Sequence, residues 1–233
     1  AAIRTTVEGN TNEDVTKVIA KVAEEFGVLP LEGAYSHKHK KHFIDETDVI
    51  MNKKMPEKPA AKYEFQKGDV FGLDVYMAIG EGKARLAEIR TTVFKRQLEN
   101  TYILKTQAGR DFISEVGKRF PSLPFSIRAF ENVTKAKLGV KHCIEHELLE
   151  PFEVHDVREG ELVVSFKATV AICPSGTLVL CGDSHFNAEN FPTDKKVEDE
   201  ELSKLLELSM DLKEQKKRKK EAKKAAKEEE KKE

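Results

Sequence analysis

Residues 161–176, ELVVSFKATVAICPSG, form a long apolar run typical of a β-strand, and a single charge, Lys167, stands in its middle. A second apolar run, VFGLDVYMAIG, contains one carboxylate, Asp74. A charge on an apolar strand is costly unless it has a partner, so each of these two residues needs one. The simplest arrangement is a sheet in which Asp74 and Lys167 meet.

The periodicity of the chain changes along its length. Apolar residues spaced as on one helical face predict a helix over 12–26, ended by Gly27. Short β-prone runs follow, and the glycines of GEGK, residues 80–83, predict a hairpin between VFGLDVYMAIG and AEIRTTVFKR. Two helical patterns, AGRDFISEVGKRF and TKAKLGVKHCIEHELL, come next, before strands return with FEVHDV and a terminal hairpin that ends in GTLVLCG.

This order predicts a mixed α/β fold with four segments. Residues 1–105 form part of the sheet core, 106–150 a helical insertion, 151–192 the remaining core strands, and 193–233 an amphipathic segment with a lysine-rich tail. The tail has no apolar face, so we expect solvated helix or disorder there.

Composition excludes several classes of protein. With 39% hydrophobic and 35% charged residues in 233 positions, the chain can bury a core and carries a charged appendage, and no apolar run is long enough to span a bilayer. The cysteines Cys143, Cys173 and Cys181 form no CxxC pair, which favours a reducing compartment and argues against a disulfide framework or a zinc knuckle.

The segment SHKHKKHFID places His37, His39 and His42 close together, a density that suggests metal binding. Lysines interleave with them and disfavour a bound cation, so a basic loop or strand edge explains His39 and His42, while His37 keeps a functional interpretation. GxSxG and HExxH motifs do not occur in the sequence, and no cysteine has a convincing histidine and acid context. The sequence therefore predicts no nucleophilic catalyst.

The segment LSKLL is an LxxLL box, in which Leu202, Leu205 and Leu206 of a short helix can dock in a partner's groove. Leucines at helical spacing more often pack on their own domain, so both interpretations stay open.

The C-terminal tail suits anionic partners, because each phosphate contact releases counterions and many weak contacts add up. Its candidate RNA-binding residues are Lys216, Lys217, Arg218, Lys219, Lys220, Lys223 and Lys224. Lysine is a point charge with little base-reading geometry, so such a tail binds without strong sequence preference. A solubilising tail of mixed sign, as in EEEKKE, is the competing interpretation.

Six motifs together resemble the proliferation-associated proteins, also known as ErbB-receptor-binding proteins, in order and in spacing. They are LEGAYSHKHKKHFID, FGLDVYMAIGEGKA, RTTVFKR, FPSLPFSIRAFE, GVKHCIEHELLEPF and VVSFKATVAICPSG. The resemblance covers nearly the whole chain and implies the α/β pita-bread fold shared with type 2 methionine aminopeptidases. Because family members are longer at the N-terminus, the chain looks like a C-terminal part, the second half of the fold with the type 2 helical insertion and a basic tail.

In the active aminopeptidases, two metal ions are held by two aspartates, a histidine and two glutamates. The resemblance places His37 at the metal histidine, Asp74 at the first glutamate and Lys167 at the second, while Asp45 stands at a substrate-contacting histidine. An ammonium has no lone pair with which to coordinate a metal. At about 4 Å and an effective dielectric near 20, two unit charges repel by about 4 kcal/mol, and a divalent ion suffers about twice that. We therefore expect a degenerate site without metal, cofactor or catalytic residues, in which Lys167 neutralises Asp74.

The function implied by the resemblance is non-enzymatic. It is that of an adaptor that binds structured RNA and the large ribosomal subunit, with roles in ribosome biogenesis, translational control and growth, and with movement between nucleolus, nucleus and cytoplasm. Protein partners would include receptors or transcription factors. The alternatives are a metal-dependent methionine aminopeptidase with an altered site, and a transcriptional co-regulator that acts through the LxxLL box.

Overall fold

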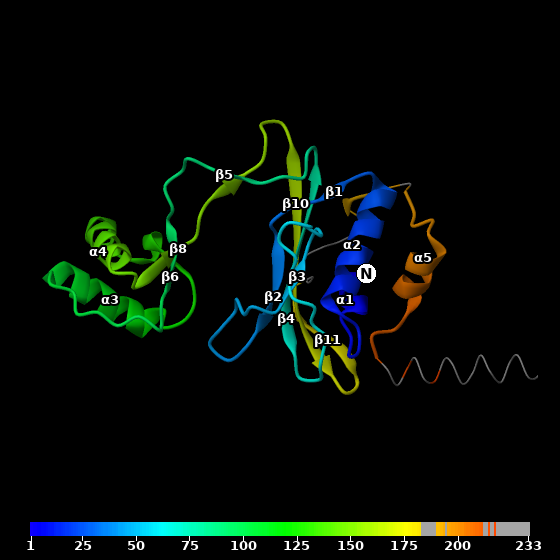
Figure 1. Cartoon of the computed structure of the whole chain (residues 1–233), viewed down its shortest axis with the longest axis horizontal. Coiled ribbons are helices and arrows are strands. Elements are labelled where there is room, and N and C mark those ends of the chain that lie inside the picture. Colours follow the sequence, from blue (N-terminus) through cyan, green and yellow to red (C-terminus); the bar gives the residue numbers. More distant parts are fainter. Residues whose placement is uncertain (183–189, 194, 212–213, 215–216, 218–233) are drawn as a thin grey trace, which may run out of the picture. The chain divides into compact units, whose positions relative to one another are not determined.

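The computed structural model describes residues 1–182, 190–193, 195–211, 214 and 217, which form two compact units (Figure 1). The first unit comprises Ala1–Lys40, Asp45–Ala84 and the described residues from Val157 onward. The second comprises Lys41–Ile44 and Arg85–Asp156. The second unit is therefore an insertion within the sequence of the first.

The first unit is built on a six-stranded sheet. Its elements are α1 (Ala2–Thr5), α2 (Asn12–Phe26), β1 (Leu29–Pro30), β2 (Tyr35–His39), β3 (Val49–Met51), β4 (Val70–Ile79), β10 (Leu162–Cys173), β11 (Gly176–Cys181) and α5 (Glu200–Glu207). The strand order is β11-β10-β4-β2-β3, and β1 also pairs with β4. All the pairs are antiparallel, and β10 and β11 form the terminal hairpin expected from the sequence.

The helix predicted over 12–26 is α2, with the same bounds. At its start the Asp14 carboxylate accepts hydrogen bonds from the backbone N–H of Thr11, at 3.0 Å, and from its hydroxyl, at 2.7 Å. These bonds satisfy donors that the first turn of a helix leaves unpaired. At its end Gly27 adopts φ 67°, a left-handed conformation that glycine reaches without strain.

The core of the first unit lies between α2 and one face of the sheet. Its buried side chains come from α2, the strands and the segment before β4, namely Val15, Ile19, Ile50, Phe65, Phe71, Leu73, Val170 and Ile172. Alternate residues of β4 and β10 point into this core, as a strand with one buried face requires. The intervening residues, Asp74 and Lys167 among them, therefore belong to the opposite face.

The first half of β10 presents apolar side chains to solvent. Strand β4 pairs with β10 from Leu162 onward, whereas the register with β11 begins only at Thr169. Leu162, Val164 and Phe166 are 66%, 51% and 52% exposed. A cavity of about 670 Å³ lies next to them, with a mainly apolar lining from α1, α2, β4 and β10. This part of the sheet is thus incompletely covered by the described residues.

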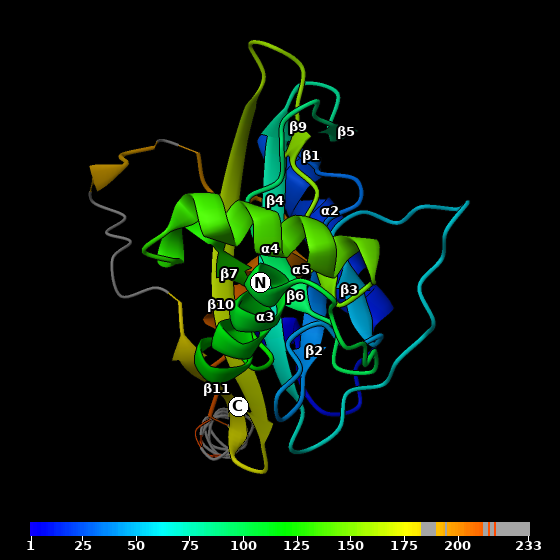
Figure 2. The ribbon, with the colours of Figure 1, turned by 90° about the vertical axis from the view of Figure 1, so that its left-hand side faces the viewer.

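The second unit pairs two helices with short strands (Figure 2). Its elements are β5 (Arg85–Leu86), β6 (Val93–Arg96), α3 (Gln107–Arg119), β7 (Phe125–Ser126), the 3-10 helix η1 (Ile127–Ala129), α4 (Val133–Glu145), β8 (Leu149–Pro151) and β9 (His155–Asp156). Phenylalanines dominate its core, and a Cβ at Gly139 would lie 2.4 Å from Phe112, so this glycine lets α3 and α4 pack closely. Across the described residues, none of the helices combines the length and the apolar character that crossing a bilayer requires.

The prediction of a hairpin at GEGK is wrong. Strand β4 pairs with β1, β2 and β10, while β5 pairs with β9, and β6 pairs with β7 and β8. Gly80 and Gly82 do have positive φ, but their turn leads the chain out of the sheet and into the second unit. Strand β10, the partner that follows β4 in the sequence, is separated from it by the whole insertion, and local turn residues do not reveal such a distant partner. The predicted insertion, 106–150, lies inside the second unit, which also includes β5, β6 and β9.

Candidate functional site

The sheet brings three of the four predicted site residues to one face. Asp74 on β4 stands directly opposite Lys167 on β10, and His37 on β2 stands opposite Gly72, two residues from Asp74 on the same face. Asp45 follows β2 in an exposed connection. The face opposite the α2 core is therefore where any chemistry of these residues takes place.

A charged contact forms the centre of this face. Lys167 Nζ lies 2.7 Å from Asp74 Oδ2, the Tyr76 hydroxyl donates a hydrogen bond to the same oxygen at 3.2 Å, and the ammonium lies 5.4 Å from the centre of the Tyr76 ring. Burial lowers the pKa of Lys167, but hydrogen bonds and charge attraction from Asp74 and Tyr76 raise that pKa by more, so it ends above its ordinary value. The ammonium is therefore charged at neutral pH.

The Asp74 carboxylate is only half satisfied. Its Oδ1 atom is buried and accepts no hydrogen bond from the described residues, while Oδ2 has both partners named above. The backbone N–H of Asp74 donates to Ser36 Oγ at 2.8 Å, and Ser36 is buried. Sequence analysis missed Ser36, since an isolated serine on a strand gives no signal.

Two histidines flank this contact on β2. His37 Nδ1 lies 3.2 Å from the Glu46 carbonyl oxygen, which orients its ring. The ring of His39 covers Gly72 so closely that a Cβ there would lie 2.5 Å from Nε2. Burial, followed by the nearby His37, lowers the pKa of His39, and Asp45 offsets this only in part. Both histidines therefore belong to the face, although sequence analysis assigned His39 to a basic loop or strand edge.

These residues do not fit a divalent cation. The position opposite Asp74 offers an ammonium, which has no lone pair and repels a cation. In the part of the chain that the structure describes, no three His, Cys, Asp or Glu side chains gather in a way that could hold a metal ion. The arrangement can hold a carboxylate and a cation in contact, and its ammonium cannot serve as the bridging ligand of a two-metal site.

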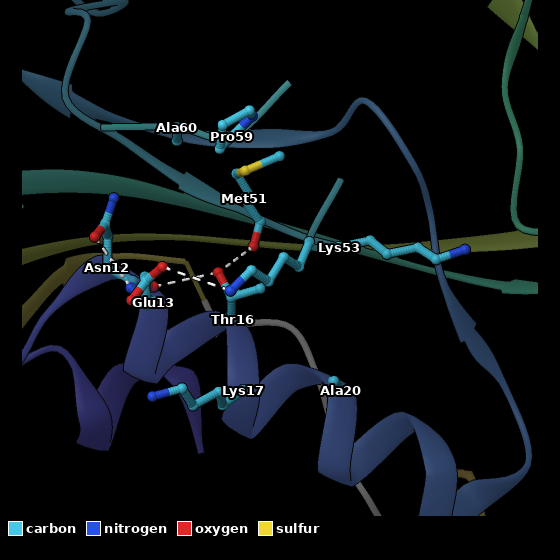
Figure 3. Close-up of a pocket in the computed structure, with 10 residues that line it drawn as sticks. Asn12, Glu13, Thr16, Lys17, Ala20, Met51, Lys53, Pro59 and Ala60 are labelled. Carbon is cyan, nitrogen blue, oxygen red and sulfur yellow. Dashed lines mark hydrogen bonds and ion pairs between the residues drawn. The ribbon is translucent and has the colours of Figure 1, made fainter. Parts of the chain in front are cut away.

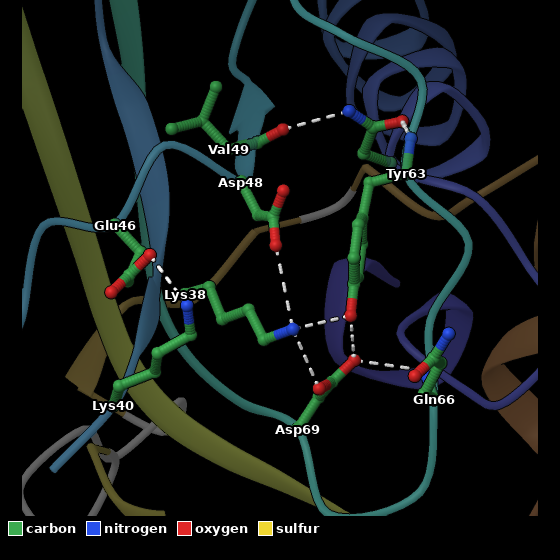
Figure 4. Close-up of polar contacts among 9 residues, drawn as sticks. Lys38, Lys40, Glu46, Asp48, Val49, Tyr63, Gln66 and Asp69 are labelled. Carbon is green, nitrogen blue, oxygen red and sulfur yellow. Dashed lines mark hydrogen bonds and ion pairs between the residues drawn. The ribbon is translucent and has the colours of Figure 1, made fainter.

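A second polar cluster, on the α2 side of the sheet, was not predicted (Figure 4). Lys38 Nζ lies 2.9 Å from Asp69 Oδ1 and 3.5 Å from Asp48 Oδ2, and it also donates to the Tyr63 hydroxyl. That hydroxyl donates to Asp69 Oδ2, which also accepts from the Gln66 N–H at 2.9 Å. This cluster has no signature in the sequence, because Lys38 looks like one of several lysines in a basic segment.

A small cavity of about 250 Å³ lies between α2 and the segment after β3 (Figure 3). Its polar side chains are already engaged. Asn12 Nδ2 donates to the carbonyls of Val49 and Ala61 at 2.9 and 2.8 Å, and Thr16 Oγ1 donates to Met51 O at 2.7 Å. These bonds fasten α2 to the neighbouring segment, so the cavity offers no polar group that awaits a ligand.

The other predicted residues lie in the C-terminal part. Leu202 of the LxxLL box is 2% exposed, and Leu205 and Leu206 are half-buried. Of the tail residues predicted to bind RNA, Lys217 is described and exposed. The others fall outside the described residues, namely Lys216, Arg218, Lys219, Lys220, Lys223 and Lys224.

Comparison with protein-family models gives no match. A relative named proliferation-associated protein A, from Dictyostelium discoideum, is 40% identical over 182 residues, which cover 78% of this chain and 47% of the relative. The curved DNA-binding protein of Schizosaccharomyces pombe is 35% identical over 210 residues, 89% of this chain and 55% of the relative. ERBB-3 binding protein 1 of Solanum tuberosum is 36% identical over 177 residues, 76% of this chain and 46% of the relative.

A solved structure, described as that of a thermophilic Arx1, aligns with a TM-score of 0.77 and 30% identity over 86% of this chain and 53% of that one. This similarity confirms the predicted α/β fold of pita-bread type. The chain spans about half the length of the curated relatives that it matches.

Proposed function

Because the chain is homologous to the proliferation-associated and ERBB-3-binding proteins, the family that its motifs predict, we propose that it is a non-enzymatic adaptor for RNA and ribosomal particles. The observation that carries the non-enzymatic part is the contact between Lys167 and Asp74 at 2.7 Å. The resemblance implies that Lys167 stands where the related aminopeptidases have a metal ligand, and on this proposal no metal is held there to activate water.

Nucleic-acid binding is supported by two basic regions. One is the lysine-rich tail, and the other is the exposed side of α4, where Lys135, Lys137 and Lys141 lie on the surface and form no ion pair with any described residue. Lysines that lack carboxylate partners are available for phosphates, and each contact adds a salt-dependent increment of affinity. One relative is itself named a curved DNA-binding protein.

The large ribosomal subunit is the target that the resemblance implies, with action in ribosome biogenesis and translational control in the nucleolus, nucleus and cytoplasm. Receptors or transcription factors are the protein partners that it implies, in keeping with relatives named ERBB-3 binding proteins. We propose that the basic regions bind ribosomal RNA, while other surfaces bind such proteins.

Co-sedimentation with purified large ribosomal subunits across a salt series tests this function. We compare the full chain, a chain that ends at Leu212, and a variant with Lys135, Lys137 and Lys141 replaced by Gln. The matched control replaces Lys40, Lys54 and Lys67, exposed lysines of the first unit that each have a carboxylate partner. We expect affinity to fall by orders of magnitude between about 50 and 200 mM salt.

The variants then locate the interaction. Weaker binding after removal of the tail or of the α4 lysines, with the control unchanged, supports an electrostatic RNA-binding adaptor. An equal loss in the control shows binding by total charge alone and contradicts the assigned regions. If the full chain does not sediment with subunits at the lowest salt, the proposed function is wrong.

A further inference from the structure

Helix α5 carries the LxxLL box and lies beside α1 and α2 (Figure 1). Leu202, the first leucine of the box, is 2% exposed, and Leu205 and Leu206 are half-buried. Lys204, in the middle of the box, is on the solvent side, with its side chain 75% exposed. The leucines therefore face the protein's own first unit, as those of a docked amphipathic helix do.

The two ends of α5 are held by side chains of opposite charge. At its N-terminal end, the Glu25 carboxylate of α2 accepts the backbone N–H of Asp199 at 3.0 Å and that of Glu198. At its C-terminal end, Arg4 Nε of α1 donates to the carbonyl oxygen of Leu208 at 3.0 Å. A helix has a partial positive charge at its N-terminus and a partial negative charge at its C-terminus, so both contacts have the favourable sign.

An exposed ion pair adds a third contact at the first turn of α5. Lys21 of α2 forms an ion pair with Glu201 in the first turn of α5. The surface of α1 and α2 that receives Leu202 is thus surrounded by three charged side chains, Arg4, Lys21 and Glu25. Arg4 and Glu25 bind backbone groups at the ends of α5. Backbone groups are common to all helices, so the requirements that this surface places on its occupant are a buried leucine, a helix of about two turns and an acidic first turn.

We propose that the surface of α1 and α2 bounded by Arg4, Lys21 and Glu25 is a docking groove for an acidic LxxLL helix, and that α5 of the same chain is its resident occupant. The box is then withheld from partners while α5 is docked. Conversely, an LxxLL helix of another protein can bind this chain only by displacing α5. Covalent attachment favours the resident helix, because an attached segment acts at an effective concentration on the order of millimolar.

The test uses a fluorescein-labelled peptide of residues 195–211 and measures its binding to the full-length chain by fluorescence anisotropy. In the variant Leu202→Asp, a carboxylate replaces the buried leucine, so α5 leaves and the groove opens. We expect the peptide to bind this variant about 100-fold more tightly than the wild-type chain, whose groove is filled. The matched control is Lys204→Asp, which places the same side chain at an exposed position of α5 and should behave like the wild type.

Substitutions in the groove identify the binding surface. In the Leu202→Asp chain, adding Glu25→Gln or Arg4→Gln should weaken binding of the peptide, since each removes a charge that complements one end of the helix. Hydrogen exchange should show that the amides of α5 lose protection in Leu202→Asp while those of β4 and β10 keep theirs. If β4 and β10 also lose protection, the milder Leu202→Ala replaces Leu202→Asp in the same comparison.

Three results would overturn the proposal. The first is an α5 that is already unprotected in the wild-type chain. The second is a released α5 with no gain in peptide binding. The third is peptide binding that is insensitive to Glu25→Gln and Arg4→Gln. None of these measurements involves RNA, so their outcome is independent of the ribosome co-sedimentation.

Discussion

The sheet of the first unit carries a lysine–aspartate–tyrosine cluster on each of its faces, and the two clusters differ in burial. We call the one on the α2 side the inner cluster, made of Lys38, Asp69 and Tyr63, and the other the outer cluster, made of Lys167, Asp74 and Tyr76. The lysine and aspartate side chains are 13% and 10% exposed in the inner cluster, but 64% and 26% exposed in the outer one.

The clusters also differ in how completely their carboxylates are satisfied. Asp69 receives the Lys38 ammonium on one oxygen and two donors on the other. Asp74 has its donors on one oxygen, while its second oxygen is buried without a partner among the described residues. The same three residue types thus build a closed structural contact on one face and an accessible, unfinished one on the other. This is why the outer cluster, and not the inner one, is the candidate functional site.

The largest expected effect comes from Lys38→Met. This change leaves Asp69 buried without its cation, and breaking a buried pair from one side destabilises a protein by about 3–5 kcal/mol. Urea unfolding followed by circular dichroism should show a much lower midpoint. The double variant Lys38→Met with Asp69→Leu should recover part of the loss, because no buried charge is left alone. A midpoint within error of the wild type for Lys38→Met would mean that the inner cluster is not a closed network in solution.

The second-largest effect should come from acid, which weakens the inner cluster. Burial raises the pKa of Asp69, but hydrogen bonds from Tyr63, the Gln66 N–H and Lys38 lower it by more, so its pKa in the folded state is below the ordinary value. The stabilisation from this group is complete above the ordinary pKa, about 3.9, and is lost as the pH falls through the lower folded value. Unfolding midpoints measured from pH 7 to pH 2 should therefore fall less steeply in Lys38→Met than in the wild type, and equal slopes would contradict this assignment.

The two tyrosines form a matched pair for the next comparison. Tyr63→Phe removes a hydroxyl that donates to Asp69 and accepts from Lys38, and it should cost about 1–3 kcal/mol by leaving a buried group poorly satisfied. Tyr76→Phe removes one hydrogen bond of 3.2 Å in a more exposed place, and should lower the free energy of unfolding by only a small fraction of the loss in Tyr63→Phe. Thermal unfolding of both variants is the measurement. Equal shifts of the two unfolding midpoints would contradict the difference in burial between the clusters.

The smallest expected effect comes from Lys167→Met. Exposed ion pairs contribute about 0–1 kcal/mol, so the unfolding midpoint should move little although the charge at the candidate site is lost. Thermal unfolding in low and high salt checks this, because salt screens an exposed pair more than a buried one. A loss of stability as large as that of Lys38→Met would show that the outer cluster is closed as well.

Local patterns in the sequence predict local structure well in this chain. Asp14 and Gly27 define the ends of α2, because capping and left-handed termination depend on residues within a few positions. The hairpin of β4 with the next strand in sequence was predicted wrongly, because turn glycines carry no information about a partner that lies beyond an insertion of dozens of residues. The contact of Asp74 with Lys167, predicted from the cost of an unpaired charge on an apolar strand, is confirmed. The two charges on apolar strands, and not the turn glycines, indicated which strands belong together.

Only part of the candidate site was predicted from the sequence, because local patterns do not show how distant strands pair. A lysine in an apolar strand is conspicuous, so Lys167 and its need for a carboxylate could be inferred from one segment. Ser36 and the ring of His39 over Gly72 could not, since their roles depend on the exact register of β2 against β4. Lys38 was hidden among neighbouring lysines, although it is the most completely paired of them.

The insertion of the second unit between β4 and β10 also has a consequence for the order of events during folding. Loop-closure entropy grows with the length of flexible chain between two contacts, and pairing of β4 with β10 would have to close the whole insertion if it were unfolded. The ends of the insertion meet in the short pair of β5 with β9, where Arg85 stands opposite Asp156. If the second unit collapses first, the connection from Ile79 to Leu162 becomes a short effective tether, so the rate at which the central sheet assembles should follow the stability of the insertion.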